Sequence, residues 1–167
     1  DNLYAQEIDL EKMELKGQQN RVLDGVSSNS TGAVQYSLSD DGTLAYLSEG
    51  GEANRKILWL DMRGKTELAS ARTENFVSVD LSPDDERLAL TIDNNIHLLD
   101  LETDLLTAFT QDASQNTYPK WHPDGQSIVF TKYREGKWGI WQQKVNFTDE
   151  AQLLFPEVDY PVIEGSF

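Results

Sequence analysis

One turn phrase that occurs three times constrains the fold of this chain more than any other feature of its sequence. The copies read YSLSDDGTLAYL, VDLSPDDERLALT and KWHPDGQSIVFT. Counted from Ser39, Ser82 and His122, they lie 43 and 40 residues apart. A period of about 40–45 residues that holds several short strands is typical of a propeller blade.

The residues at the centre of each copy favour a reverse turn. Pro83 and Pro123 stand at the second turn position, where the fixed φ of proline suits the backbone. Gly42 and Gly125 stand at the fourth position, where glycine adopts a positive φ at little cost. Asp85 replaces glycine in the middle copy, and aspartate tolerates the same conformation. Each copy therefore predicts a turn between two apolar strands of one hairpin.

The acidic residues of these turns could instead bind a hard cation. A calcium loop needs oxygen ligands at alternating positions within one loop. The Asp-Asp-Gly pattern lacks that spacing, so we favour the turn role and expect no metal site. The residues concerned are Asp40, Asp41, Asp84, Asp85 and Asp124.

The repeat divides the chain into three whole units and two partial ones. Short apolar stretches alternate with turn residues about every 8–12 residues, and no window shows helical periodicity. We therefore expect an all-β fold, a β-propeller of four-stranded antiparallel blades. The expected segments are a half blade at 1–26, blades at 33–70, 75–111 and 117–155, and the first strand of a further blade at 160–167. Within the half blade, a charged connection at 9–17 is expected to join two strands, 3–8 and 21–23.

Large apolar residues recur in the predicted third strands. Trp59, Leu98 and Trp141 lie 39 and 43 residues apart, and we interpret them as equivalent positions. Because an aromatic side chain buries a large area, packing between blades is the favoured role. A surface on which a ligand stacks is the alternative.

Composition excludes several function classes. The net charge of −15 argues against nucleic acid, because phosphate binding needs clustered Lys and Arg. The chain has no cysteine, so disulfides and thiolate metal sites are excluded. No apolar run is long enough to span a bilayer, so no direct membrane insertion is expected.

Motifs of catalysis are missing as well. The sequence contains no G-x-S-x-G elbow and no glycine-rich phosphate loop. Its two histidines, His97 and His122, lack the spacing of a zinc site, and each is interpreted as structural. We expect no catalytic residue, no metal and no cofactor, so the chain is predicted not to be an enzyme.

The three phrases, in particular SDDGTLAY, SPDDERLALT and WHPDGQSIVF, resemble the WD40-like PD40 repeat of TolB-type propellers. Asp61 and Asp100, which end the predicted third strands, also fit that repeat. Asp85 for Gly, His122 for Ser and Gln143 for Asp depart from it. Similar repeats form sensor domains of bacterial receptor kinases and of membrane-bound winged-helix regulators, which segment 1–26 resembles most.

The resemblance implies a non-catalytic binding or sensor scaffold of the bacterial cell envelope, periplasmic or otherwise extracytoplasmic. It would bind a protein partner or small ligand on its loop face. The alternative is the accessory propeller of a serine peptidase or polysaccharide-active enzyme whose catalytic domain lies outside this chain. Loops that enter each first strand converge around a propeller axis, although loop residues are also polar by default. They nominate Arg72, Glu74, Asn75, Gln115, Asn116, Tyr118 and Tyr160 as a binding site.

The predicted blade count leaves both ends of the chain with unpaired strand edges. Such edges pair with whatever strand is available. Either the parent protein continues into further blades, or two copies form a homodimer in which 160–167 of one copy lies beside 3–23 of the other. Self-closure into a four-bladed ring is the alternative.

Overall fold

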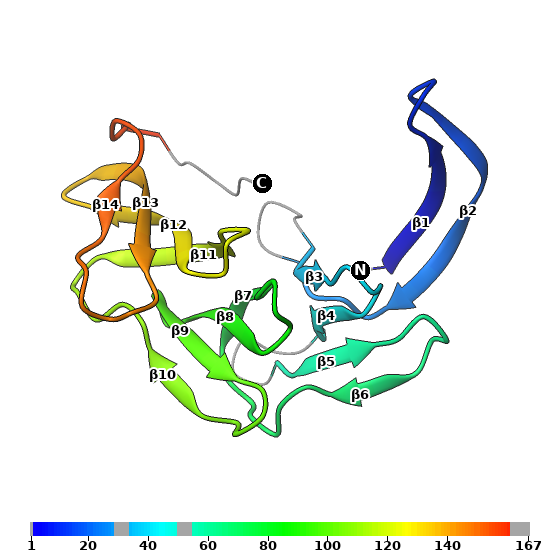
Figure 1. Cartoon of the computed structure of the whole chain (residues 1–167), viewed down its shortest axis with the longest axis horizontal. Coiled ribbons are helices and arrows are strands. Elements are labelled where there is room, and N and C mark those ends of the chain that lie inside the picture. Colours follow the sequence, from blue (N-terminus) through cyan, green and yellow to red (C-terminus); the bar gives the residue numbers. More distant parts are fainter. Residues whose placement is uncertain (1, 29–33, 50–54, 161–167) are drawn as a thin grey trace.

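Fourteen strands and no helix make up the described part of the chain, residues 2–28, 34–49 and 55–160 of a computed structural model. They form one two-stranded and three four-stranded antiparallel sheets, which follow one another along an open arc (Figure 1). The predicted all-β fold with four-stranded antiparallel blades is confirmed. None of these residues forms a helix of the length and apolarity needed to cross a bilayer.

The strands of each sheet follow the order of the sequence, as they do in propeller blades. The hairpin pairs β1 (Asn2–Asp9) with β2 (Glu14–Asp24). The first blade holds β3 (Tyr36–Leu38), β4 (Leu44–Leu47), β5 (Ile57–Leu60) and β6 (Thr66–Leu68). The second holds β7 (Phe76–Leu81), β8 (Arg87–Ile92), β9 (Asn95–Asp100) and β10 (Leu106–Ala108). The third holds β11 (Gln115–Trp121), β12 (Ser127–Arg134), β13 (Lys137–Lys144) and β14 (Gln152–Leu153).

The charged connection predicted over 9–17 is wrong. Its C-terminal part belongs to β2, which begins at Glu14 and pairs with β1 from there. An ion pair of 2.9 Å between Lys16 and Asp9 adds to this pairing. Almost every side chain of β2 is exposed, so the strand carries no apolar alternation from which it could be recognised.

The three turns have the predicted geometry. In each, the fourth residue donates its backbone N–H to the carbonyl of the first at 2.9–3.1 Å. That fourth residue has a positive φ of 88° at Gly42, 59° at Asp85 and 66° at Gly125. The carboxylate at the third position also serves the turn, since Asp41 accepts the N–H of Thr43 at 2.9 Å. Turn chemistry therefore accounts for the repeated aspartates.

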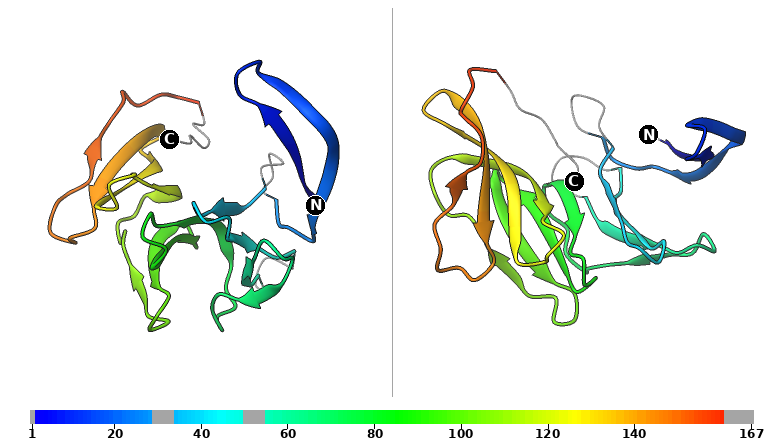
Figure 2. Two further views of the ribbon diagram at one scale, coloured as in Figure 1. Left: turned by 45° about the vertical axis from the view of Figure 1, so that its right-hand side comes forward. Right: turned by 45° about the horizontal axis from the view of Figure 1, so that its top comes forward.

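Two apolar clusters join the three blades. Leu47, Phe76 and Leu90 belong to the cluster between the first and second blades. Leu98 and Phe130 belong to the cluster between the second and third. The first strands are the innermost, because β7 contacts both β3 and β11, and the fourth strands lie at the outer rim (Figure 2). The first strands of the three blades therefore lie side by side at the inner edge of the arc.

The predicted equivalence of the third-strand tryptophans is wrong for one of them. Trp59 lies opposite Ala45 and Leu98 lies opposite Ala89, at matching positions of their sheets. Trp141 lies opposite Phe130, one residue out of register, and belongs to the cluster with the second blade. Because successive residues of a strand point to opposite faces, Trp59 faces the next blade and Trp141 faces the preceding one.

Asp80 on β7 ties the three inner strands together. Its carboxylate accepts the hydroxyl of Ser37 on β3 at 3.3 Å. It also accepts the ammonium of Lys120 at 3.1 Å and the N–H of Trp121 at 2.7 Å, both on β11. Ser37 in turn accepts the N–H of Leu81 at 3.0 Å. The residue is only 9% exposed, so these donors replace water that burial removes.

The two ends of the arc remain open. The hairpin exposes apolar side chains that include Leu10 (74%), Met13 (75%) and Leu15 (67%). At the other end, Val158 forms an isolated bridge with Trp138 of β13. Residues 161–167, on which the proposed strand exchange depends, lie outside the described residues. The homodimer and the continuation into further blades both stay predictions.

We expect Asp80→Asn to lower the free energy of unfolding by about 2–3 kcal/mol, because it breaks a buried ion pair and leaves a buried donor without an acceptor. Urea unfolding followed by tryptophan fluorescence measures this change. Glu102→Gln, an equal change of charge at an exposed position, serves as the control and should stay within about 0.5 kcal/mol of the parent chain. Equal unfolding free energies for the two variants would show that Asp80 does not hold the blades together.

Candidate functional site

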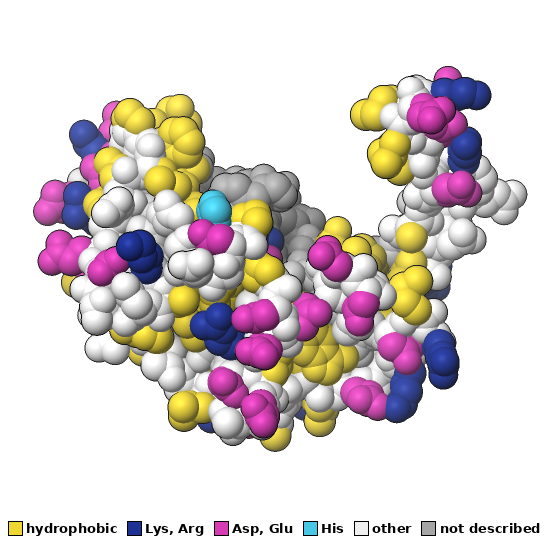
Figure 3. Space-filling model, viewed as in Figure 1, with side chains coloured by type: hydrophobic (Ala, Val, Ile, Leu, Met, Phe, Trp, Pro, Cys, Tyr) yellow, Lys and Arg dark blue, Asp and Glu magenta, His cyan; other side chains and the backbone are white. Residues whose placement is uncertain are grey.

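Two adjoining grooves open at the end of the inner strands where the repeated turns lie. The axial groove has a volume of about 370 Å³ and is lined by Ser37, Asp40, Asp80, Lys120 and Trp121, among others. The tryptophan groove has a volume of about 350 Å³ and runs between the first and second blades. Figure 3 shows carboxylate side chains gathered around hydrophobic atoms in the lower middle of this face. Both grooves share Ser39, Leu81 and Asp85, so they form one continuous surface.

The polar groups of the axial groove are already occupied by the scaffold. Burial raises the pKa of Asp80, against the opposing effect of the Lys120 ammonium and the Trp121 N–H. The carboxylate stays satisfied by its three donors from β3 and β11. Trp121 lines the groove, and the guanidinium of Arg87 lies 4.7 Å from the centre of its ring. This groove is a preformed concave surface rather than a set of free reactive groups.

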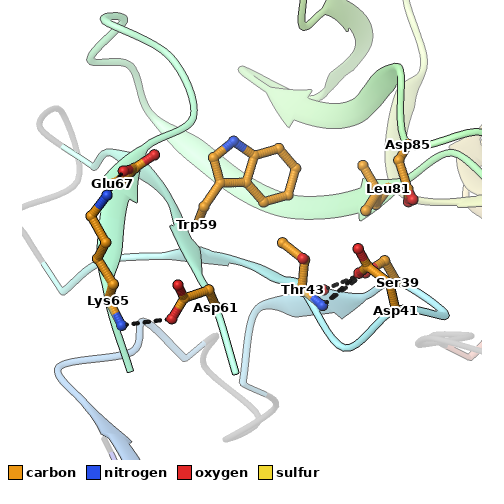
Figure 4. Close-up of a pocket in the computed structure, with 9 residues that line it drawn as sticks. All are labelled: Ser39, Asp41, Thr43, Trp59, Asp61, Lys65, Glu67, Leu81 and Asp85. Atoms are coloured by element: carbon orange, nitrogen blue, oxygen red, sulfur yellow. Dashed lines mark hydrogen bonds and ion pairs between the residues drawn. The ribbon is translucent and has the colours of Figure 1, made fainter. Parts of the chain in front are cut away.

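The tryptophan groove combines an aromatic ring with four carboxylates. Figure 4 shows the indole of Trp59 in the middle, with Lys65 and Glu67 on one side and Leu81 and Asp85 on the other. Lys65 forms an ion pair with Glu67. The remaining carboxylates come from the β3–β4 turn, from the β5–β6 turn and from the β7–β8 turn, as Asp41, Asp61 and Asp85.

Of these three carboxylates, two are held by hydrogen bonds within their own turns and the third is not. Asp61 accepts the backbone N–H groups of Arg63 at 2.8 Å and Lys65 at 2.9 Å. The Ser39 hydroxyl and the Thr43 N–H lower the pKa of Asp41. Asp85 has no side-chain hydrogen bond among the described residues. Partial burial raises its pKa, and repulsion from Asp41, Asp40 and Asp84 adds to the shift.

The nominated residues lie away from both grooves. Arg72 donates to the carbonyl of Asp104 at 2.9 Å and so joins the first blade to the outer turn of the second. Glu74 forms an isolated bridge with Arg55. Tyr160 is 66% exposed beyond the third blade. As a binding site these residues stay a prediction.

Three nominated residues belong to a strand rather than to the loop that precedes it. Gln115, Asn116 and Tyr118 are part of β11, which begins earlier than predicted. Tyr118 has a φ of 53° at a bulge in the strand, and its N–H donates to Thr91 at 3.2 Å. Asn75 donates to Asp93 at 3.4 Å. The contact of Tyr118 attaches β11 to β8 of the preceding blade, and that of Asn75 attaches the residue before β7 to the turn that follows β8.

Asn116 is fully buried and holds the connection that enters β11. Its amide donates to Asp112 at 2.9 Å and to the carbonyl of Ser114 at 3.3 Å. Its backbone N–H donates to the carbonyl of Asn94 at 2.8 Å. Lys132 of β12 completes this arrangement with an ion pair to Asp112. The role of Asn116 is structural, because no surface of it reaches solvent.

Sequence reasoning singled out Asp40 and Asp85 of the axial groove as turn residues, but it missed the three polar residues that line the groove from the inner strands. Ser37, Asp80 and Lys120 are 43 and 40 residues apart, the same spacings as the turns. That periodicity was sufficient to align them at the same level of three inner strands. Their polarity within otherwise apolar strands was the signal that could have revealed them.

Neither histidine forms part of a larger constellation in the described chain. His122 caps its own turn, where its Nδ1 lies 3.3 Å from the N–H of Asp124. His97 on β9 lies 3.4 Å from the carbonyl of Asn95. No group of three or more His, Cys, Asp or Glu side chains among the described residues could hold a metal ion.

Comparison with known proteins agrees with this architecture. The sequence matches no protein-family profile and no curated protein. Among solved structures, TolB from Acinetobacter baumannii is similar at 18% identity and a TM-score of 0.69, over 89% of this chain and 37% of that one. A putative TolB from Agrobacterium tumefaciens is similar at 15% identity and 0.63, over 83% and 53%. The β-propeller domain of the Trilobed protease from Pyrococcus furiosus is similar at 17% identity and 0.54, over 76% and 42%.

These likenesses define the class of fold: the chain is a TolB-like β-propeller, present here as an open arc of blades. It spans about a third to a half of the length of the two TolB structures. The predicted resemblance to TolB-type propellers is confirmed. The closer resemblance to sensor domains of receptor kinases stays a prediction.

The Asp112 arrangement predicts a pH dependence. Partial burial alone would raise the pKa of Asp112, but donation from Lys132, Asn116 and the Ser114 N–H outweighs it and lowers the pKa to about 2. Because the folded pKa lies below the unfolded value of about 3.9, this group stabilises the fold above that pH. The contribution is lost as the pH falls towards 2. It should stay below about 1 kcal/mol, because the side chain is 46% exposed.

Urea unfolding curves recorded at about four pH values between pH 5 and pH 2 measure this effect. We expect Asp112→Asn to flatten the loss of stability, and Lys132→Met to flatten it in the same way by removing the main donor. If both variants lose stability with pH as steeply as the parent chain, the assignment to this pair is wrong.

Proposed function

We propose that this chain is part of a non-catalytic binding or sensor propeller of the bacterial cell envelope. It holds a protein partner on the face where the repeated turns lie. The observation that carries this proposal is the pair of adjoining open grooves at that end of the blades. Preformed concave surfaces lined by a few polar and aromatic groups are the usual binding sites of folded domains.

The state of the groove residues favours binding over catalysis. Asp80 and Lys120 are engaged with each other and with the backbone, so neither is poised to exchange a proton with a substrate. His122, the histidine of the third turn, interacts with its own turn at Asp124. A protein partner suits the extent of the surface, since the two grooves continue into each other across two blades.

The location outside the cytoplasm is supported by the likeness to the TolB structures. The absence of cysteine is compatible with that compartment. A second candidate is the accessory propeller of a peptidase, which the likeness to the Trilobed protease propeller favours. Both candidates give this chain a binding role, and they differ in the domain to which it is attached.

The proposal can be tested in the parent bacterium with a photo-crosslinking amino acid placed in the full-length protein. Asp40 is exposed and lines the axial groove, whereas Lys137 is exposed at the opposite end of the third blade. We expect a discrete crosslinked product from position 40 in the envelope fraction, and none from position 137.

Equal products from both positions, or none from position 40, would overturn binding at the turn face. Recovery of the full-length protein in the cytoplasmic fraction would overturn the location. The crosslinked polypeptide identifies the partner directly by mass spectrometry.

A further inference from the structure

We propose that the tryptophan groove binds an arginine side chain from a basic segment of a partner protein, with the guanidinium stacked on Trp59 and paired with Asp85. This inference rests on the proposed function and names the chemistry that one of its grooves recognises. The groove has three properties that such a side chain requires: an aromatic face, a negative rim and sufficient space.

The aromatic face is open. Trp59 projects from β5 towards the second blade, and its indole is half-buried rather than enclosed. Leu81 lines the groove from the second blade, beside Asp85 (Figure 4). A volume of about 350 Å³ is at the lower end of the range for ligand sites and holds a long side chain with its adjoining backbone.

Two of the other three tryptophans of the chain have an arginine side chain over the ring. The guanidinium of Arg87 lies 4.7 Å from the centre of the Trp121 ring. The guanidinium of Arg134 lies 4.6 Å from the Trp141 ring. Among the described residues no Lys or Arg stacks on Trp59 in this way. The ring faces carboxylates instead, so the cation that would complete the same contact has to come from another molecule.

The charges of the groove favour a cation strongly. Four carboxylates surround the space and only one ammonium, that of Lys65, which is already paired with Glu67. The negative charge of Asp85 is the least compensated of the four. The acidic turn of the neighbouring blade repels it, and among the described residues no side-chain donor reaches it. A cation placed between Asp85 and Asp41 would relieve this repulsion.

A guanidinium suits the groove better than a metal ion does. Asp41 and Asp61 already accept backbone N–H groups, which turns part of their oxygens away from a common centre. A hydrated divalent ion gains little from an indole face, whereas a guanidinium is planar, weakly hydrated and able to stack. Its N–H groups can also donate to a carboxylate in a bidentate manner.

The experiment is a titration of the ¹⁵N-labelled chain followed by NMR, with acetyl-Gly-Arg-Gly-amide as the ligand. The same peptide with citrulline in place of arginine keeps the shape but removes the charge. We expect a saturable shift of the Trp59 indole N–H with the arginine peptide and none with the citrulline peptide. High salt should weaken the binding, because part of it comes from exposed charges.

Two variants test the contacts. Trp59→Leu keeps an apolar side chain against the second blade and should weaken binding about ten-fold. Asp85→Asn should weaken it by a similar factor. Asp93→Asn is the matched control, because Asp93 has the same charge and also a positive φ, of 47° against 59°, but lies at the other end of the second blade. It should bind like the parent chain. Unchanged spectra away from the groove confirm that each variant is folded.

Three results would overturn the inference: equal affinity for Asp85→Asn and Asp93→Asn, full affinity for Trp59→Leu, or shifts produced by calcium chloride but not by the arginine peptide. The last result would identify a simple acidic cation site. Crosslinking from position 40 in the cell would then still support a binding face, so failure of this inference can be told apart from failure of the proposed function.

Discussion

The cohesion of the blades depends on the way in which polar groups are satisfied between the inner strands. A propeller packs sheets face to face, and apolar clusters such as the one around Phe76 and Leu90 supply most of the contact. Such contact is non-directional. The carboxylate of Asp80 adds direction, because it accepts donors from the strands on both sides of it. It therefore fixes the relative height of three blades as well as their proximity.

The same turns that close the hairpins also create the candidate site. Each turn needs a residue with a positive φ and an acceptor for its free N–H groups, and aspartate serves both needs at Asp85 and Asp41. Because blades stack side by side, the aspartates of neighbouring turns come together on one face. The acidic face is thus a consequence of turn chemistry, and Trp59 gives one part of it an aromatic wall.

The blades have similar backbones but differ in the side chains that line the grooves between them. The first blade exposes a ring among carboxylates, whereas the third covers Trp141 with Lys132 and Arg134. A single residue of register decides this difference, because it turns Trp141 to the opposite face from Trp59. Repetition therefore supplies the scaffold, and departures from it distinguish one inter-blade groove from the next.

The sequence by itself determined the repeat, the turns and the all-β class, because the positive φ at Asp85 and the period of the apolar strands are local properties. It did not reveal β2, whose exposed residues carry no pattern, nor the face of Trp141, which depends on pairing across β12 and β13. The sequence alone also did not predict the two grooves. Trp59 and Asp85 line one groove only because stacking brings the first and second blades together. Asn116, nominated from the sequence, is fully buried and donates to Asp112. Tertiary structure decided the site because each groove is made of side chains far apart in the chain.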